Sequence, residues 1–349
     1  MINRNSVLPV SFVVLALLAP CGAAAAAQPA AESPKIDTPQ QPAQANDFFE
    51  PGTLKAIAGG LRFTEGPLWD AARNRLIFSD IAADAIYTLT PPGDGAELAI
   101  PEILRQPSER ANGNAFTKDG RIVTADHNGR ITIAPADDMA SAKVIAAKWD
   151  GKRLNSPNDI VVHPDGSLWF TDPTFGIRPQ EREIPFTGVF RMTKAQGQDA
   201  NADEWTINVA TQEMQLPNGL VFSPDYKTLN VAEYRANEIH AFDVNAAATK
   251  PEELLTNKRL IAKMEDPARG RADGLKVDVD GNIYTTGPGG LWVFSPEGKE
   301  LARLAVPGAS NLCFGGADNK TIFITAGPAV FSVRAKHPGF LPDWTPKAK

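Results

Sequence analysis

The sequence predicts an all-β protein with the architecture of a six-bladed β-propeller, and three observations lead to that prediction. One pattern, a short apolar strand, a turn and a returning strand, occurs six times along the chain. The copies start 47, 46, 60, 55 and 38 residues apart, and periods of about 40–50 residues built of short strands are typical of propeller blades. The 3.6-residue apolar period of a long amphipathic helix does not occur.

The six copies define one domain, which we expect to extend from residue 48 to residue 345. They begin at Glu65, Asn112, Asn158, Asn218, Asp273 and, more weakly, Asn311. The third copy predicts strands at 160–162 and 168–170, joined by a turn at 163–166. Further strands are expected between the copies, at residues 85–90, 187–192, 238–244 and 291–295. A strand near 54–57 is expected to close the last blade, because an unclosed ring leaves bare sheet edges.

The first position of the pattern carries a side-chain oxygen in all six copies. The first strand of a propeller blade lines the central channel, so one such residue per blade forms a ring at one mouth of the channel. The alternative is that these residues only favour turns, as Asn and Asp do, and glycine follows four of them. Glu65 is not a turn former, and Asp rather than Gly follows Asn158. The ring is therefore the favoured interpretation, and a β-sandwich, the competing fold, does not explain it.

The composition of this ring predicts a metal site. Two carboxylates with neutral amide oxygens, and no Cys or His among the six positions, suit a hard divalent cation. Calcium accepts about six to eight oxygen ligands in loose geometry, whereas magnesium requires an octahedron and zinc prefers nitrogen and sulfur. Calcium is the expected ion, with zinc or magnesium as alternatives.

Composition and motifs exclude several other functions. The net charge of −6 and the pI near 5.4 argue against nucleic-acid binding. The sequence contains neither a G-x-S-x-G nucleophile elbow nor a P-loop, so a hydrolytic site here would be metal-assisted.

The N-terminus predicts export to the periplasm or secretion. Residues 1–27 have the layout of a signal peptide, with an apolar run at 7–18 that is too short to span a bilayer and an A-x-A cleavage site at 25–27. Beyond this signal peptide no membrane association is expected. Residues 28–47 are rich in Ala, Pro and Gln and are expected to form a linker. A lipoprotein anchored at Cys21 is the alternative, although Pro20 stands where a lipobox needs a small residue.

Maturation would leave Cys313 as the single cysteine, and therefore no internal disulfide. Its neighbours are apolar, so we expect it to be a small buried hydrophobe.

Several motifs together resemble one known family. They are F-T-E-G-P-L-W, S-P-N-D-I-V-V, W-F-T-D-P-T-F-G-I, L-P-N-G-L-V-F-S-P-D, R-A-D-G-L-K-V-D and G-P-G-G-L-W-V-F. From about residue 53 to residue 333 the chain resembles the calcium-dependent propellers of the SMP-30/gluconolactonase/LRE-like family, most of all its bacterial gluconolactonase-type members.

The resemblance implies a ligand set. Glu65, Asn218 and Asp273 fall on positions that hold the metal in the family. Asn158 falls on an asparagine that binds the metal in some relatives and the substrate in others. Some members carry an arginine two residues before it to bind the sugar, and Ser156 stands there in this chain. That departure weakens the case for gluconolactone itself as the substrate.

The expected function is metal-dependent hydrolysis of a sugar-type lactone, as in gluconolactonases, with a small-molecule lactone or ester as the binding partner. Calcium on Glu65, Asn158, Asn218 and Asp273 would polarise the ester carbonyl, and Asp273 would serve as general base.

Asn112, His127 and Asp172 are the predicted substrate contacts. Asp172 and His127 follow returning strands and should reach the same mouth, although each could instead be a turn residue. Two other functions stay open at this stage: a promiscuous arylesterase or phosphotriesterase that uses the same site, and a non-catalytic periplasmic binding propeller.

Overall fold

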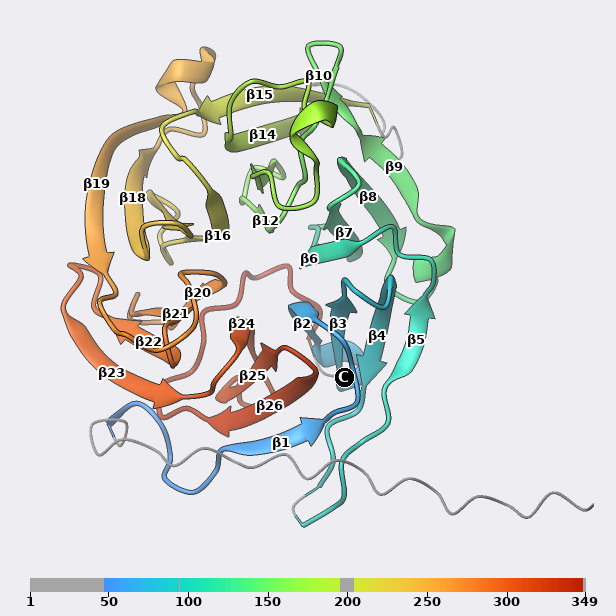
Figure 1. Cartoon of the computed structure of the whole chain (residues 1–349), viewed down its shortest axis with the longest axis vertical. Coiled ribbons are helices and arrows are strands. Elements are labelled where there is room, and N and C mark those ends of the chain that lie inside the picture. Colours follow the sequence, from blue (N-terminus) through green and yellow to red (C-terminus); the bar gives the residue numbers. More distant parts are fainter. Residues whose placement is uncertain (1–46, 94, 195–203, 348–349) are drawn as a thin grey trace, which may run out of the picture. The chain divides into compact units, whose positions relative to one another are not determined.

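The computed structural model describes residues 47–347, apart from residue 94 and residues 195–203. The predicted signal peptide and residues 28–46 of the predicted linker lie outside the described residues. The described chain forms six four-stranded antiparallel sheets arranged around a centre, with the first strand of each repeat innermost (Figure 1). The predicted all-β, six-bladed propeller is confirmed.

The strands follow the order of the blades. Blade 1 contains β2 (Thr64–Asp70), β3 (Arg75–Asp80), β4 (Ala85–Leu89) and β5 (Glu102–Arg105). Blade 2 contains β6 (Ala111–Phe116), β7 (Arg121–Asp126), β8 (Arg130–Pro135) and β9 (Lys143–Ala146). Blade 3 contains β12 (Ile160–Val162), β13 (Leu168–Asp172), β14 (Gly188–Lys194) and β15 (Trp205–Thr211). Blade 4 contains β16 (Pro217–Phe222), β17 (Thr228–Glu233), β18 (Glu238–Val244) and β19 (Leu255–Lys263). Blade 5 contains β20 (Leu275–Val277), β21 (Ile283–Gly287), β22 (Gly290–Phe294) and β23 (Glu300–Ala305). Blade 6 contains β24 (Ala309–Gly315), β25 (Thr321–Ala326), β26 (Ala329–Arg334) and β1 (Lys55–Ala58).

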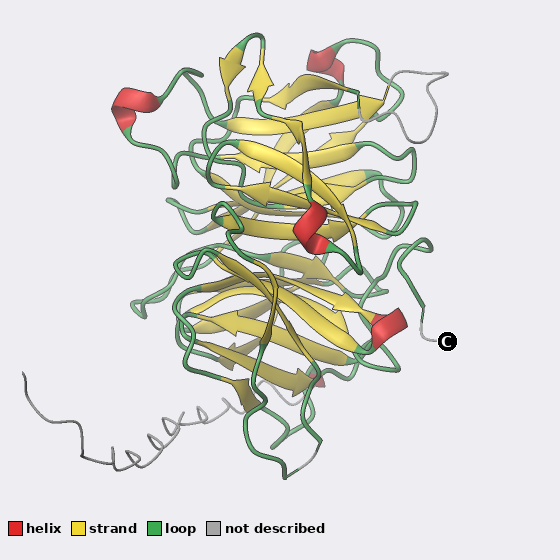
Figure 2. Ribbon diagram, turned by 90° about the vertical axis from the view of Figure 1, so that its right-hand side faces the viewer, coloured by secondary structure: helices red, strands yellow, loops and turns green. Residues whose placement is uncertain are grey.

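Strands make up most of the regular structure (Figure 2). A small hairpin of β10 (Lys148–Trp149) and β11 (Lys152–Arg153) lies between blades 2 and 3. The described helices are 3-10 turns of three residues: η2 (Ala71–Arg73), η3 (Met139–Ser141), η4 (Pro179–Glu181) and η5 (Pro251–Glu253). Within the described residues none of these is long and apolar enough to cross a membrane.

The first strand of the described chain closes the ring. β1 pairs with β26, and Lys55 lies opposite Ser332 in the register. Blade 6 therefore takes three strands from the end of the chain and one from its beginning, as the sequence predicts. Pairing β1 in this way covers the edge that β26 would otherwise expose.

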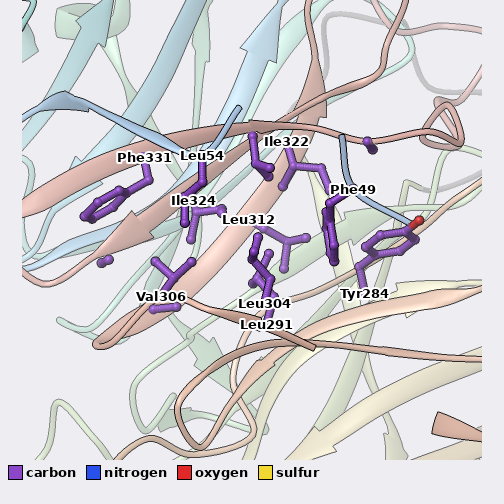
Figure 3. Close-up of a cluster of buried hydrophobic side chains, with 14 of the residues drawn as sticks. Phe49, Leu54, Tyr284, Leu291, Leu304, Val306, Leu312, Ile322, Ile324 and Phe331 are labelled. Carbon is purple, nitrogen blue, oxygen red and sulfur yellow. The ribbon is translucent and has the colours of Figure 1, made fainter. Parts of the chain in front are cut away.

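Apolar side chains fill the spaces between neighbouring blades. Figure 3 shows the cluster between blades 5 and 6, in which Tyr284 and Leu291 of blade 5 meet Leu312 and Ile324 of blade 6. Each fully buried side chain of this size stabilises the fold by about 1.5–3 kcal/mol. Cys313 is buried, as expected from its apolar neighbours, and burial raises the pKa of its thiol to about 12.

Residues 335–347, which follow β26, form a C-terminal segment that crosses the centre of the ring (Figure 1). It lies at the end of the channel where the inner strands finish. The Phe340 N–H donates to the Val277 carbonyl of blade 5 at 2.9 Å. Trp344 Nε1 donates to the Phe116 carbonyl of blade 2 at 3.3 Å. The segment covers a mostly apolar cavity of about 140 Å³. A polar substrate is therefore expected to approach from the other mouth, where the inner strands begin.

Candidate functional site

The six ring positions predicted from the sequence lie at the beginnings of the six inner strands. Glu65, Asn112, Asn218 and Asn311 stand within their strands, whereas Asn158 and Asp273 come just before β12 and β20. Five of the six residues are almost fully buried, and Asp273 is partly exposed.

Hydrogen bonds at or next to the ring positions link each blade to the next. From blade 1 onward they are Asn114 Nδ2 to Gly66 O at 2.9 Å, Gly113 N to Asn158 O at 2.8 Å, Thr171 Oγ1 to Asn218 O at 2.6 Å, Gly219 N to Asp273 O at 3.2 Å, Gly274 N to Ser310 O at 2.9 Å and Asn311 Nδ2 to Glu65 Oε2 at 3.1 Å. Because each blade is tied to the next, the six side chains are held at one level of the channel.

The glycines that follow four of the ring residues are required by close approach of the strands. A Cβ on Gly66 would lie 1.9 Å from the Asn112 carbonyl oxygen, and one on Gly219 would lie 2.3 Å from the Asp273 carbonyl oxygen. Gly113 and Gly274 are equally confined by residues of the next blade. Since no side chain fits there, the repeated Asn-Gly and Asp-Gly pairs reflect a narrow channel rather than turn formation.

Asp159 takes the place of glycine in blade 3, and its carboxylate is buried in the channel. Oδ1 accepts the Ile160 N–H at 2.9 Å, while Oδ2 has no hydrogen-bond partner among the described residues. Its negative charge raises the pKa values of Glu65 and Asp273. Asp159 is a site residue that was not predicted. The signal for it is that it occupies the position after the ring residue, where four other blades have glycine.

The ring concentrates negative charge without a basic partner among its six positions. Burial raises the pKa of Glu65 to about 7, although bonds from Gly66 and Asn311 oppose the shift. Burial, followed by repulsion from Glu65 and Asp159, raises the pKa of Asp273 well above its ordinary value. Carboxylates that repel one another in a buried site favour either protons or a cation. This donor set fits a hard divalent cation.

His127 orients two of the ring amides. Asn112 Nδ2 lies 3.0 Å from His127 Nε2, and Asn158 Nδ2 lies 3.5 Å from the same atom. Burial, and then the nearby charge of Arg110, lowers the pKa of His127 to about 4. The neutral ring therefore accepts from amide N–H groups, which turns the amide oxygens away from it. Asn112 Oδ1 is buried without a partner in the described part of the chain, as expected of an atom that awaits a ligand.

Comparisons with known proteins show which family the chain belongs to. The sequence pattern described as the SMP-30/Gluconolactonase/LRE-like region matches residues 63–327. The chain belongs to this family. A gluconolactonase from Zymomonas mobilis is 31% identical over 303 residues, which cover 81% of each chain.

Two solved structures of similar proteins share the fold. The gluconolactonase from Xanthomonas campestris superposes with a TM-score of 0.71 at 30% identity, over 86% of this chain and 95% of that one. Regucalcin from Agrobacterium tumefaciens, a calcium-binding protein, superposes with a TM-score of 0.63 at 18% identity, over 84% and 98% of the two chains. The second likeness concerns the fold alone.

Asp172 is predicted to contact the substrate, but in the structure backbone N–H groups bind its carboxylate. Its two carboxylate oxygens accept the N–H groups of Asn155 and Ser156 at 2.9 and 2.7 Å, and the residue is fully buried. Burial raises its pKa to about 7, although both bonds oppose the shift. Asp80 in blade 1 and Glu233 in blade 4 bind the equivalent N–H groups. This geometry gives Asp172 a structural role and speaks against a substrate contact.

Ser156, which replaces the arginine found in some family members, is also buried and structural. Its hydroxyl donates to the Pro173 carbonyl at 3.2 Å and accepts the Gly176 N–H at 2.9 Å. It therefore fixes the loop 173–177 beside the mouth.

Three residues near the mouth were not predicted from the sequence. Arg110 donates from Nη1 to the Gly176 carbonyl at 3.2 Å. Tyr234 packs edge to face on Phe175, with ring centroids 4.9 Å apart. The charges of Asp273 and Arg271 both influence the pKa of Tyr234, which burial raises. The motif R-A-N-G at 110–113, repeated as R-A-D-G at 271–274, is the signal that could have pointed to both arginines.

A second group of metal-ligand types lies outside the ring. Asp278, Asp280 and His337 have ligand atoms within 4.8 Å of one another. Both oxygens of Asp278 already accept hydrogen bonds, from Asp280 N, Asn282 N and Asn282 Nδ2. The ring, with its unpartnered oxygens, is the better cation site.

Proposed function

We propose that this chain opens a sugar-type lactone by hydrolysis and that the ring of inner-strand oxygens holds the calcium ion this reaction requires. The observation that carries the proposal is the pair of carboxylates, Glu65 and Asp273, in a buried ring of amide oxygens with no basic side chain among its six positions. The similar gluconolactonases indicate a lactonase activity, and the carboxylate and amide oxygens of the ring suit calcium.

Glu65, Asn158, Asn218 and Asp273 would hold the ion. When bound, calcium would supply a Lewis acid that polarises the ester carbonyl and stabilises negative charge on its oxygen. Glu65 is suited to be a ligand only, because it is 3% exposed and Gly66 and Asn311 already donate to its Oε2.

Asp273 is suited to the general base. It is the partly exposed member of the ring, so a carboxylate oxygen that does not bind the ion can accept a proton from water. His127, held neutral by burial, keeps the amides of Asn112 and Asn158 in place during the reaction.

The test is hydrolysis of a panel of aldonolactones and aryl esters, followed by pH-stat, with calcium and after chelation. We expect turnover of lactones that disappears on chelation and returns when calcium is added. Preferential turnover of aryl esters would identify the promiscuous esterase alternative. Turnover of none of these compounds would leave a binding propeller, whose ligand binding need not depend on calcium.

We also propose that the chain is exported and cleaved after Ala27. The n-region, the apolar run at 7–18 and the A-x-A site at 25–27 support this proposal. Mass spectrometry of the protein from the periplasm and growth medium of expressing bacteria should find a chain that begins at Gln28. A cytoplasmic chain that begins at Met1 would contradict it.

A further inference from the structure

The backbone just before the first strand of blade 2 is held differently from the equivalent backbone in blades 1, 3 and 4. In blades 1, 3 and 4 the carboxylate at the end of the second strand accepts the N–H groups of the residues three and two positions before the ring residue. In blade 2 that carboxylate belongs to Asp126, which instead binds Arg130, with Nε to Oδ2 at 3.2 Å. The Arg110 N–H donates to Asp84 Oδ1 at 2.8 Å.

This change is accompanied by an unusual backbone. Glu109 and Arg110 are consecutive and have φ values of 63° and 61°. The left-handed region is costly for residues with a Cβ, and such residues persist where surrounding contacts hold them and often mark a functional site. Here the hydrogen bond from the Arg110 N–H to Asp84 Oδ1 is the contact that holds this backbone conformation.

The result is that Arg110 stands beside the ring at the open mouth. Its backbone carbonyl accepts the His127 N–H at 3.0 Å, and its Nη1 reaches the Gly176 carbonyl. Gly176 lies directly on His127, because a Cβ on Gly176 would be 2.5 Å from the His127 Cβ. His127 in turn contacts Asn112 of the ring. Gly176 and His127 therefore link the guanidinium to the oxygen ring.

A second arginine occupies the same position in blade 5. Arg271 is two residues before Asp273, as Arg110 is two residues before Asn112, and its side chain is exposed. Blades 2 and 5 are opposite each other in the ring (Figure 1). The other four blades have uncharged residues at this position: Phe63, Ser156, Leu216 and Ala309. The mouth is thus flanked by two positive charges.

We propose that Arg110, with Arg271 opposite it, binds an anionic group, a carboxylate or a phosphate, that the lactone substrate carries. A guanidinium has five N–H donors in a planar fork that matches both groups, and the Gly176 carbonyl takes one of them. The substrate class would be acidic sugar lactones rather than neutral ones. This inference rests on the proposed lactonase function.

The test compares three lactones with the calcium-loaded full chain: neutral glucono-1,5-lactone, glucaro-1,4-lactone with a carboxylate, and 6-phosphogluconolactone with a phosphate. We expect kcat/KM for at least one acidic lactone to exceed that of the neutral one by about tenfold or more. Arg110→Ala should remove most of this preference by raising KM, and Arg110→Lys should restore part of it. The two acidic lactones distinguish a carboxylate from a phosphate.

Arg259→Ala, on the outermost strand of blade 4, is the matched control and should keep the preference. Equal kcat/KM for neutral and acidic lactones in the native protein would overturn the proposal, whether or not Arg110→Ala folds. An equal loss toward all three lactones in Arg110→Ala would also overturn it and leave Arg110 as an anchor of the loop 173–177. Failure to hydrolyse any lactone, in the panel above as well, would refute the proposed function itself.

Discussion

Asn311 and Glu65 join the last blade to the first at the level of the ring. The Asn311 amide donates to Glu65 Oε2 at 3.1 Å, although 246 residues separate the two in the chain. The Leu312 N–H donates to Asn311 Oδ1 at 2.8 Å, which fixes the direction of the amide. A proposed metal ligand near the beginning of the propeller is therefore positioned by its last blade. Closure of the ring and formation of the cation site are coupled.

Replacing Asp273 with asparagine should abolish lactonase turnover and leave the fold intact. Asparagine keeps the size of the side chain but removes the proposed base and half of the ring's carboxylate charge. We expect kcat to fall by at least about 100-fold, measured by pH-stat with calcium in excess. Asp225→Asn, in the turn between β16 and β17, is the control and should retain activity. Full activity of Asp273→Asn would exclude the proposed role.

His127→Ala should weaken calcium binding more than it weakens the fold. Without the imidazole the amides of Asn112 and Asn158 lose the acceptor that turns their oxygens into the ring. Removing a residue that orients the metal ligands typically weakens metal binding by about 10- to 100-fold. Titration calorimetry with calcium measures the change, and His163→Ala, in the turn between β12 and β13, should bind calcium like the native protein. Unchanged affinity in His127→Ala would show that the histidine does not orient the ring.

Gly113→Ala should destabilise the protein strongly. The added methyl would lie 2.5 Å from Asp159 Oδ1 and 2.8 Å from the Asn158 carbonyl oxygen. Overpacking of this kind costs about 1–3 kcal/mol or more. At Gly93 an added Cβ would meet no atom of the described residues within 4 Å, its chain neighbours aside, so Gly93→Ala should leave the free energy of unfolding almost unchanged. Urea denaturation of both variants measures the difference, and equal stabilities would refute the close approach of the inner strands.

Calcium should stabilise the protein more at pH 8 than at pH 5. The pKa of Glu65 is raised from 4.5 to about 7, so the metal-free folded protein holds a proton there that the unfolded chain loses near pH 4.5. The stability due to this proton is present below pH 4.5 and is lost as the pH rises through about 7. Above that pH the free carboxylates repel each other, and calcium can replace the proton. The calcium-induced change in Tm, measured from pH 5 to pH 8, should therefore grow with pH, and a constant change would argue against binding at these carboxylates.

Most of the fold could be predicted from the sequence because one strand-turn-strand pattern occurs six times. An oxygen-bearing residue at one phase of six hairpins predicted the inner strands and the ring. These features depend on local patterns that each blade repeats, so they can be recognised without knowledge of distances. The closing strand near residues 54–57 was predicted because an unclosed ring leaves bare sheet edges.

Features that depend on contacts between blades could not be predicted in the same way. The need for glycine at 66, 113, 219 and 274 comes from the distance between neighbouring inner strands. The position of Asp172 near the mouth followed from its hairpin, but its partners are backbone N–H groups that the sequence does not distinguish. Arg110 was missed because its placement depends on left-handed backbone held by Asp84.

The most direct measurement of the central claim is a crystal structure of the protein grown with calcium, with anomalous diffraction to locate the ion. We predict one calcium ion in the inner-strand ring, with oxygens of the four proposed ligands, Glu65, Asn158, Asn218 and Asp273, about 2.3–2.6 Å away. An empty ring at saturating calcium, or an ion bound only at Asp278, Asp280 and His337, would contradict the account.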